Sequence, residues 1–194
     1  IIVSADNAGI ERTARIIAEG GLVAFPTETV YGLGANARDD HAVAQIFAAK
    51  NRPRFNPLIV HVPTMGDARR LAQFDDRAEE IASAFWPGPL SIVLPRRADA
   101  GLSFLVSAGL NTIALRLPDN ELARKLLTVA QCPIAAPSAN RSGEVSPTTA
   151  EHVAQSLPAP GDNGPSLILD GGPCGVGLES TVVDLSEPMA SLLR

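Results

Sequence analysis

Short apolar runs alternate with segments of helical periodicity along most of the chain, and this alternation restricts the possible folds more than any other feature. Strands are expected at residues 1–3, 22–25, 58–62, 90–94, 112–117, 133–136, 167–169, 181–185 and 191–193. Helices are expected from Asp6 or Asn7 to Gly20-Gly21, from Asp39 or Asp40 to Lys50, at 66–73, 76–85 and 119–130, and from Ser146-Pro147, with serine as the cap. Because strands and helices alternate, we predict an α/β fold: one domain over residues 1–194 with a single mixed sheet.

Composition narrows the classes of function. With 45% hydrophobic and 19% charged residues, the chain is neither disordered nor a coiled coil, and no apolar run approaches the roughly 18–20 residues that a membrane span needs. The formal net charge is −5, whereas most nucleic-acid-binding modules have an excess of basic residues, so the composition does not favour nucleic-acid binding. Cys132, Cys174 and three scattered histidines have no metal-ligand spacing, so we expect no zinc site and a reducing, cytoplasmic setting.

Residues 26–34 follow an apolar strand, and ligands of α/β proteins gather beyond the carboxyl ends of strands. The residues from Gly32 to Ala37 match the G-x-G-x-x-A pattern of dinucleotide-binding folds. Six residues separate this pattern from the end of the strand, however, so the tight strand-to-helix turn of that fold is absent. Two interpretations stay open: a polar loop whose threonine hydroxyls line a pocket, or a turn around a buried tyrosine.

Residues 50–57 place three cations, Lys50, Arg52 and Arg54, within five residues, and two prolines stiffen the segment. A lysine ammonium, which acts as a point charge, and the planar guanidinium of an arginine together are well suited to bind phosphate oxygens. We therefore expect an anion site here, with Lys50 and Arg52 accessible to solvent. The alternative is a cation that offsets a helix dipole, which explains only Lys50.

Other polar residues lie in apolar or glycine-rich surroundings. A lone strand histidine such as His61 more often packs than functions. Arg116 interrupts an apolar strand, a costly position unless the charge is paired with a neighbouring acid or bound to a ligand. Ser138 and Asn140 could share one face, and the glycine-rich residues 170–181 could approach a ligand or form a hairpin. Cations, hydroxyls and amides suit positioning and charge stabilisation more than proton transfer.

Six motifs occur in the same order as in one known family: PTETVYGLG (26–34), KNRPRFNPL (50–58), FWPGPL (85–90), ALRLPDN (114–120), PSANRSG (137–143) and LESTVVDL (178–185). Through them nearly the whole chain resembles the YrdC-type family of L-threonylcarbamoyladenylate synthases. The K-x-R and S-x-N pairs of that family stand here as Lys50/Arg52 and Ser138/Asn140. A paralogous branch lacks the S-x-N pair, so its presence favours the synthase branch.

The resemblance implies a twisted, open α/β sheet with flanking helices and a concave active face. The last motif looks like the longer form of the family. We therefore expect residues 1–194 to be the catalytic domain of a two-domain protein whose C-terminal domain lies beyond residue 194.

The implied activity is nucleotidyl transfer: L-threonine, bicarbonate or CO2, and ATP give L-threonylcarbamoyl-AMP and pyrophosphate. Mg²⁺ would be carried by ATP, with no tightly bound organic cofactor and no protein metal site. The product would feed a downstream transferase that makes threonylcarbamoyladenosine in tRNA. The alternative is an RNA-binding module of the same fold without synthase activity, which the net charge of −5 disfavours.

The resemblance also implies residue roles. The ATP contacts would be Lys50, Arg52, Asn56, Thr112, Asn140, Ser146 and Arg194, with Lys50 and Arg52 as catalytic residues. The threonine contacts would be Thr29, His61, Arg116, Ser138 and Ser180. Arg116 would pair with the amino-acid carboxylate.

Overall fold

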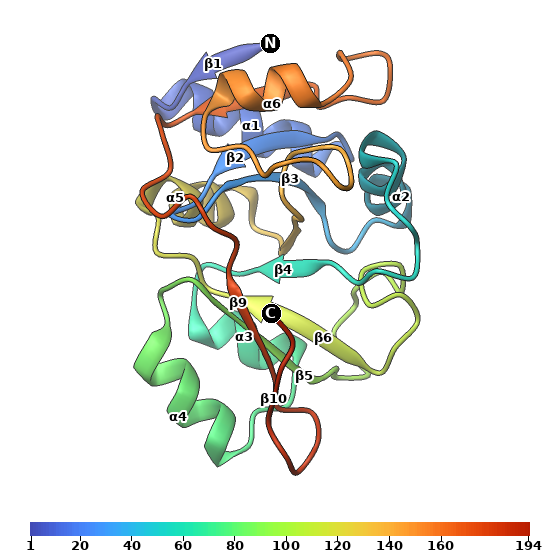
Figure 1. The fold of residues 1–194 in the computed structure, drawn as a ribbon, viewed down its shortest axis with the longest axis vertical. Helices are drawn as coiled ribbons and strands as arrows, with labels where there is room; N and C mark the ends of the chain where they lie inside the picture. The colour runs from blue at the N-terminus through green and yellow to red at the C-terminus, as the bar shows by residue number, and fades with distance from the viewer.

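Ten strands and six helices, interspersed along the chain, make up the computed structural model, which describes residues 1–194 (Figure 1). The strands are β1 (Ile2–Ser4), β2 (Val23–Pro26), β3 (Tyr31–Asn36), β4 (Ile59–His61), β5 (Leu90–Pro95), β6 (Thr112–Arg116), β7 (Ile134–Ala135), β8 (Leu167–Asp170), β9 (Thr181–Asp184) and β10 (Ser191–Leu192). The helices are α1 (Asn7–Ala18), α2 (Asp40–Lys50), α3 (Met65–Leu71), α4 (Asp76–Phe85), α5 (Glu121–Ala130) and α6 (Ala150–Ser156). The predicted α/β class is confirmed. None of these helices has the length and apolar character that a membrane crossing requires.

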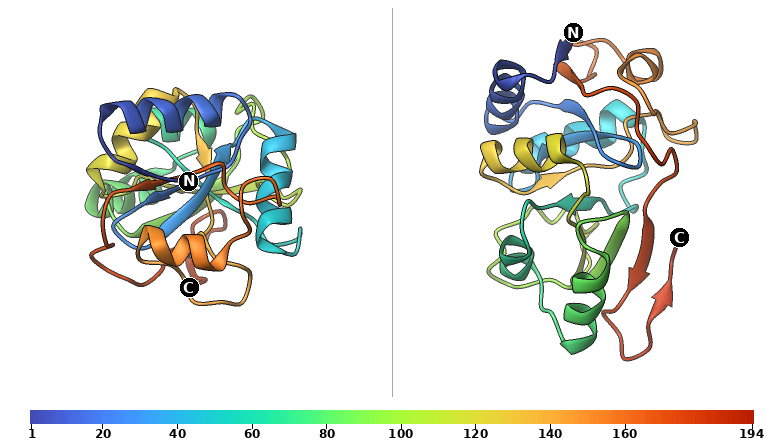
Figure 2. Two further views of the ribbon diagram at one scale, coloured as in Figure 1. Left: turned by 90° about the horizontal axis from the view of Figure 1, so that it is seen from above. Right: turned by 90° about the vertical axis from the view of Figure 1, so that its left-hand side faces the viewer.

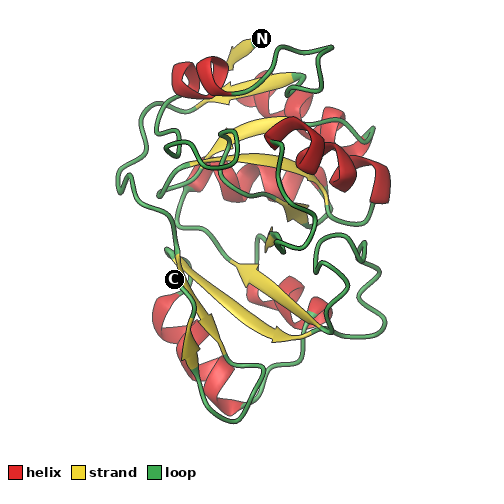
Figure 3. Ribbon diagram, turned by 45° about the vertical axis from the view of Figure 1, so that its right-hand side comes forward, coloured by secondary structure: helices red, strands yellow, loops and turns green.

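The strands form one mixed sheet in the order β1-β8-β2-β3-β7-β4-β6-β5-β9-β10. Parallel pairs such as β4 with β6 stand beside antiparallel pairs such as β5 with β6. The sheet runs through the middle of the molecule with helices outside it (Figure 3). Helices α1 and α5 cover one side, and α6 lies on the other (Figure 2). The predicted open mixed sheet is therefore present.

The core explains why the helices lie where they do. Helices α1 and α5 pack together and bury Ile17 and Leu126 against Phe25 of β2. A larger cluster unites Ile46 of α2 with Leu115 of β6. The helix caps also follow from sequence. Asp6 accepts a hydrogen bond of 2.8 Å from Gly9 N, and Asp39 caps α2 in the same way, as their side-chain chemistry predicts.

Strand β3 differs from the sequence prediction, which places residues 31–34 in a loop or turn. Glycine is depleted in strands, and β3 holds two glycines. The structure shows why they stand there. A Cβ atom on Gly34 would lie 2.7 Å from Phe25 Cε1 and 2.9 Å from Ile134 Cγ2. Glycine in this strand therefore lets neighbouring side chains approach closely, which is one established use of a strand glycine.

The helix expected to begin at Ser146-Pro147 begins later, so that prediction is wrong. Thr149 is the N-cap of α6, and its hydroxyl accepts a hydrogen bond from His152 N. Pro147 O accepts a hydrogen bond of 2.9 Å from Tyr31 N, and the Ser146 hydroxyl donates to Glu179. These long-range bonds hold residues 146–147 outside the helix.

Candidate active site

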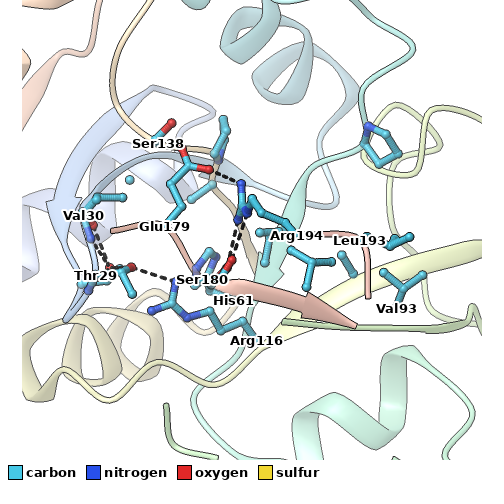
Figure 4. A pocket seen from close by; sticks show the side chains of 18 of the residues that line it. Thr29, Val30, His61, Val93, Arg116, Ser138, Glu179, Ser180, Leu193 and Arg194 are labelled. Carbon is cyan, nitrogen blue, oxygen red and sulfur yellow. Dashed lines mark hydrogen bonds and ion pairs between the residues drawn. The ribbon is translucent and has the colours of Figure 1, made fainter. Parts of the chain in front are cut away.

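A cavity of about 260 Å³ lies over the middle strands of the sheet (Figure 4). Its walls come from the β2–β3 connection and β3, from the α2–β4 connection, from β4, β5 and β6, from the segment after β7, from residues 179–182 at β9, and from the last two residues. Seven of the predicted contact residues line it: Thr29, Arg52, His61, Arg116, Ser138, Ser180 and Arg194. The fold therefore joins side chains that are up to 165 positions apart in the sequence (194 − 29).

The strand register places His61 beside Arg116. These two residues are direct partners in the parallel pairing of β4 with β6, as are Ile59 and Ala114. Side chains alternate across a strand, so all four project from the same face, and all four line the cavity. Leu115, between them in sequence, faces the core instead. A shift of β4 by one residue in this pairing would move His61 to the opposite face of the sheet and separate it from Arg116.

Arg116 is 4% exposed, and its guanidinium lies close to three protein groups. Its Nη2 lies 2.6 Å from Glu28 Oε1, its Nη1 donates to the Thr29 hydroxyl at 3.1 Å, and its Nε donates to Gly88 O at 3.3 Å. The first interpretation, a pair with a neighbouring acid, is therefore confirmed, and ligand binding stays a prediction for a guanidinium that lines the cavity. Burial lowers its pKa, and the Glu28 charge opposes that shift. Glu28 was not singled out from the sequence, although it lies inside the 26–34 motif.

Two threonines of the β2–β3 connection support this arrangement. The Thr27 and Thr29 hydroxyls lie 2.8 Å apart, and Thr27 donates to Val30 O at 2.7 Å. Both side chains line the cavity. The prediction of threonine hydroxyls in a pocket is therefore confirmed for residues 27–30, and the buried Tyr31 of the alternative is also present in β3.

His61 is 3% exposed, and its ring meets Phe25 edge-on with centroids 6.3 Å apart. Nδ1 has no hydrogen-bond partner. Burial, together with the charge of Arg116, lowers the imidazole pKa from 6.5 to about 3. The side chain is therefore a neutral imidazole at physiological pH, able to form a hydrogen bond but not to supply positive charge.

Acidification from pH 7 to pH 5 is expected to destabilise the protein by about 2 kcal/mol through His61. Between pH 6.5 and about 3 only the unfolded chain binds the proton, so stability present above pH 6.5 is lost as the pH falls. Urea unfolding at both pH values measures the effect. A His61→Gln variant should lose this part of the pH dependence, whereas the exposed His41→Gln control should keep it. An unchanged pH slope in His61→Gln would contradict a buried neutral imidazole.

Glu179 lies at the rim among hydroxyls and cations, between Ser138 and Arg194 (Figure 4). Oε1 accepts a hydrogen bond of 2.8 Å from Ser146, and Arg194 forms an ion pair with Oε2. Burial acts to raise the pKa of this carboxyl, but the bond from Ser146 and the charge of Arg194 outweigh burial and the pKa is lowered. Glu179 is ionised at neutral pH. Sequence reasoning missed it because a lone acid after a glycine-rich run is typical of an exposed loop.

Arg194 also binds Ser180 on the other side of the rim. Its Nε donates to Ser180 O at 2.9 Å and its Nη2 to Ser180 Oγ at 3.1 Å. That hydroxyl is also 2.9 Å from Ser91 Oγ. Residues 179–180 and the last residue therefore form one connected edge of the cavity.

The expected anion segment contributes one arginine to the cavity. Arg52 lines the wall and is held by its own loop, donating from Nε to Asn56 O at 3.3 Å and from Nη2 to Pro57 O at 3.0 Å. Its pKa is lowered by burial and by Arg194, while Glu179 raises it. Arg54 is exposed and does not line the cavity. Lys50 is 1% exposed, so the expectation of a solvent-accessible lysine is wrong.

Comparison with known proteins identifies the family of the chain. The model of the Sua5/YciO/YrdC family, described as "Telomere recombination", matches residues 15–194.

The chain belongs to the Sua5/YciO/YrdC family.

Two curated members of this family are named threonylcarbamoyl-AMP synthase. The protein from Pyrococcus abyssi is 49% identical over 95% of this chain and 53% of its own length, and the one from Bacillus subtilis is 47% identical over 99% of this chain and 54% of its own length. The chain thus spans about half the length of the curated relatives it matches. A crystal structure of P. abyssi Sua5 complexed with L-threonine covers 100% of this chain and 57% of that one, with 47% identity and a TM-score of 0.94.

Five predicted ATP contacts of this Sua5/YciO/YrdC member lie outside the cavity lining: Lys50, Asn56, Thr112, Asn140 and Ser146. Asn56 contributes its carbonyl to Arg52, and Ser146 reaches the rim through Glu179. Asn140 donates from Nδ2 to two carbonyls of its own loop and leaves Oδ1 buried without a partner. Thr112 begins β6 and is half-buried.

The glycine-rich residues 170–181 do not form a hairpin, since the strands that they connect, β8 and β9, are not neighbours in the sheet. The segment packs along the threonine connection instead. Val176 N donates to Glu28 O at 2.9 Å, and Gly177 N donates to Thr29 O at 3.0 Å. The Tyr31 hydroxyl donates to Gly172 O at 2.8 Å. These bonds join residues 170–181, which include Glu179, to the β2–β3 connection, whose residues contact Arg116.

Proposed function

We propose that this protein is an L-threonylcarbamoyladenylate synthase. It would convert L-threonine, bicarbonate or CO2, and ATP into L-threonylcarbamoyl-AMP and pyrophosphate. The observation that carries the proposal is the cavity in which the buried Arg116 and the hydroxyls of Thr29, Ser138 and Ser180 meet, beside two further arginines. The names of the relatives and the threonine complex of the P. abyssi protein support the same conclusion.

The site supports this reaction by positioning and by charge. Arg116 would bind the carboxylate of threonine, and the surrounding hydroxyls would bind its side-chain hydroxyl. The amine of threonine captures CO2 as a carbamate, and a carbamate oxygen then attacks the α-phosphorus of ATP while pyrophosphate leaves. Such transfers need alignment and neutralisation of charge more than a strong base. The neutral His61 fits a role in orientation by hydrogen bonding.

Arg52 and Arg194 are the cations that would face the triphosphate, since both line the cavity.

Mg²⁺ would enter with ATP as part of the substrate, since magnesium is commonly bound by one or two carboxylates together with phosphate oxygens. Glu179, which is ionised and lines the cavity, would be available as such a carboxylate. We propose that the product is consumed by a tRNA-modifying threonylcarbamoyl transferase. We also propose a cytoplasmic setting, to which the two free thiols Cys132 and Cys174 conform.

The proposal is tested by incubating the protein with ATP, L-threonine and bicarbonate and following pyrophosphate and the adenylate product. We expect formation of both to require all three substrates. Calorimetric binding of L-threonine and of ATP, each alone, distinguishes a chain that binds without turnover from one that does not bind. Pyrophosphate release that is independent of threonine would contradict the synthase. RNA binding that weakens steeply with salt and ignores ATP, in a chain that makes no adenylate, would favour the RNA-binding alternative.

A further inference from the structure

Lys50 ends helix α2 with its side chain inside the protein. It is 1% exposed, and its Nζ donates to Ser138 O and to Asn140 O, both at 2.5 Å. None of the seven ion pairs in the structure involves it. Hydrogen bonds to two carbonyl groups therefore replace the water that would otherwise solvate this buried ammonium. Loss of either bond would leave the ammonium and a carbonyl oxygen without that partner.

The main chain of Lys50 also binds the segment of residues 138–142. Ser142 N donates to Lys50 O at 2.8 Å. The start of the segment is tied to β3, where Ala139 N donates to Tyr31 O at 2.8 Å and Ser138 forms a bridge with Gly32. Residues 138–142 are thus fixed by β3 at one end and by Lys50 along the rest. Ser138, the first residue of this segment, lines the cavity, and Lys50 does not.

We propose that Lys50 is a positioning residue: its ammonium fixes the main chain of residues 138–142, which presents Ser138 to the cavity, and it does not contact the substrate phosphates. Because Lys50 does not line the cavity, its ammonium would have to move away from Ser138 O and Asn140 O to reach a triphosphate there, and both carbonyls would lose this donor. Positive charge at the phosphates comes instead from Arg52 and Arg194, which line the cavity. The kinetic part of this inference rests on the proposed function, but its structural part does not.

The first test uses the unmodified protein, which has two lysines, Lys50 and the exposed Lys125. The protein is treated with acetic anhydride at pH 8.5, and each lysine is quantified by mass spectrometry. Burial lowers the pKa of Lys50 to about 8, so a large part of it is the reactive neutral amine, and slow labelling reports lack of access. We expect at least tenfold slower labelling of Lys50 than of Lys125, with no change when ATP is added. Rapid labelling of Lys50 that ATP suppresses would overturn the inference.

The second test compares Lys50→Met with Lys125→Met as the matched control. In the ligand-free protein, hydrogen exchange of the amides in residues 138–142 should become at least tenfold faster in Lys50→Met and stay unchanged in Lys125→Met. Among the kinetic constants, KM for threonine should rise at least as much as KM for ATP, because Ser138 lies on the moved segment. Unchanged exchange with a rise in KM for ATP alone would show direct phosphate binding and refute the positioning role.

These readouts also distinguish failure of this inference from failure of the proposed function. Labelling and hydrogen exchange need no substrate. If they follow the expectation while the unmodified protein makes no adenylate, the synthase proposal fails and the positioning role stands. If Lys50→Met does not fold, the labelling experiment alone decides, because it uses the unmodified chain.

Discussion

Replacing Arg116 by Met should abolish most synthase activity and also lower the free energy of unfolding by about 3–5 kcal/mol, the usual cost of leaving a buried charge without its partner. Glu28, 2.6 Å from the guanidinium and with a side chain only 14% exposed, would keep its negative charge without a counterion. Threonine would lose the group proposed to bind its carboxylate. Urea unfolding measures the first effect, and the KM for threonine measures the second.

The double variant Glu28→Gln/Arg116→Met separates the two effects. With no unpaired charge in the site, it should recover most of the lost stability, because replacing both members of a buried pair is far less costly than removing one. It should not recover threonine binding. Recovery of activity in the double variant would show that Arg116 is a structural partner of Glu28 and nothing more. Wild-type stability in the single variant would contradict the buried ion pair.

The second large effect is expected at Arg52. Replacement by Ala should reduce kcat/KM for ATP by about 100-fold, since removing one member of a close charge pair commonly costs about 2–5 kcal/mol. The guanidinium lines the cavity and is held by Asn56 O and Pro57 O, so its direction is fixed before a ligand arrives. Steady-state kinetics at saturating threonine and bicarbonate measures the change.

Arg54→Ala is the matched control for this prediction. Arg54 has the same charge, lies two residues away, is exposed and does not line the cavity. Its replacement should alter kcat/KM for ATP by less than about twofold, since exposed charges contribute little. Equal losses in both variants would mean that the segment attracts ATP by its total charge and that the fixed direction of Arg52 is irrelevant.

The charged groups in and beside the cavity also explain how a chain with a net negative charge can hold a cationic site. Arg52, Arg194 and Arg116 line a cavity whose nearby acids, Glu28 and Glu179, each neutralise one arginine in the structure. The net charge of −5 is therefore a property of the whole surface and does not describe the cavity. A local cluster is sufficient for anion chemistry, because interactions inside a partly buried site are screened less than those on the surface.

Most secondary structure was predictable because local chemistry decides it. Helix α1 begins after Asp6, whose carboxylate caps it, and β4 and β6 lie at apolar runs that the sequence shows directly. The errors occurred where a distant part of the chain overrides the local pattern. Strand β3 contains Gly34 because Phe25 and Ile134 occupy the space of a side chain, and Ser146 is drawn out of α6 by Glu179.

The sequence by itself determined the α/β class, the caps of helices α1 and α2 and, through its motifs, the family and seven of the residues that line the cavity. Only the tertiary structure decided which polar residues act together. The pairing of Arg116 with Glu28, the place of Glu179 among the arginines and the burial of Lys50 under residues 138–142 all join segments far apart in the chain. The physical reason is that helix and strand patterns depend on neighbours in sequence, whereas burial and charge pairing depend on which strands lie side by side.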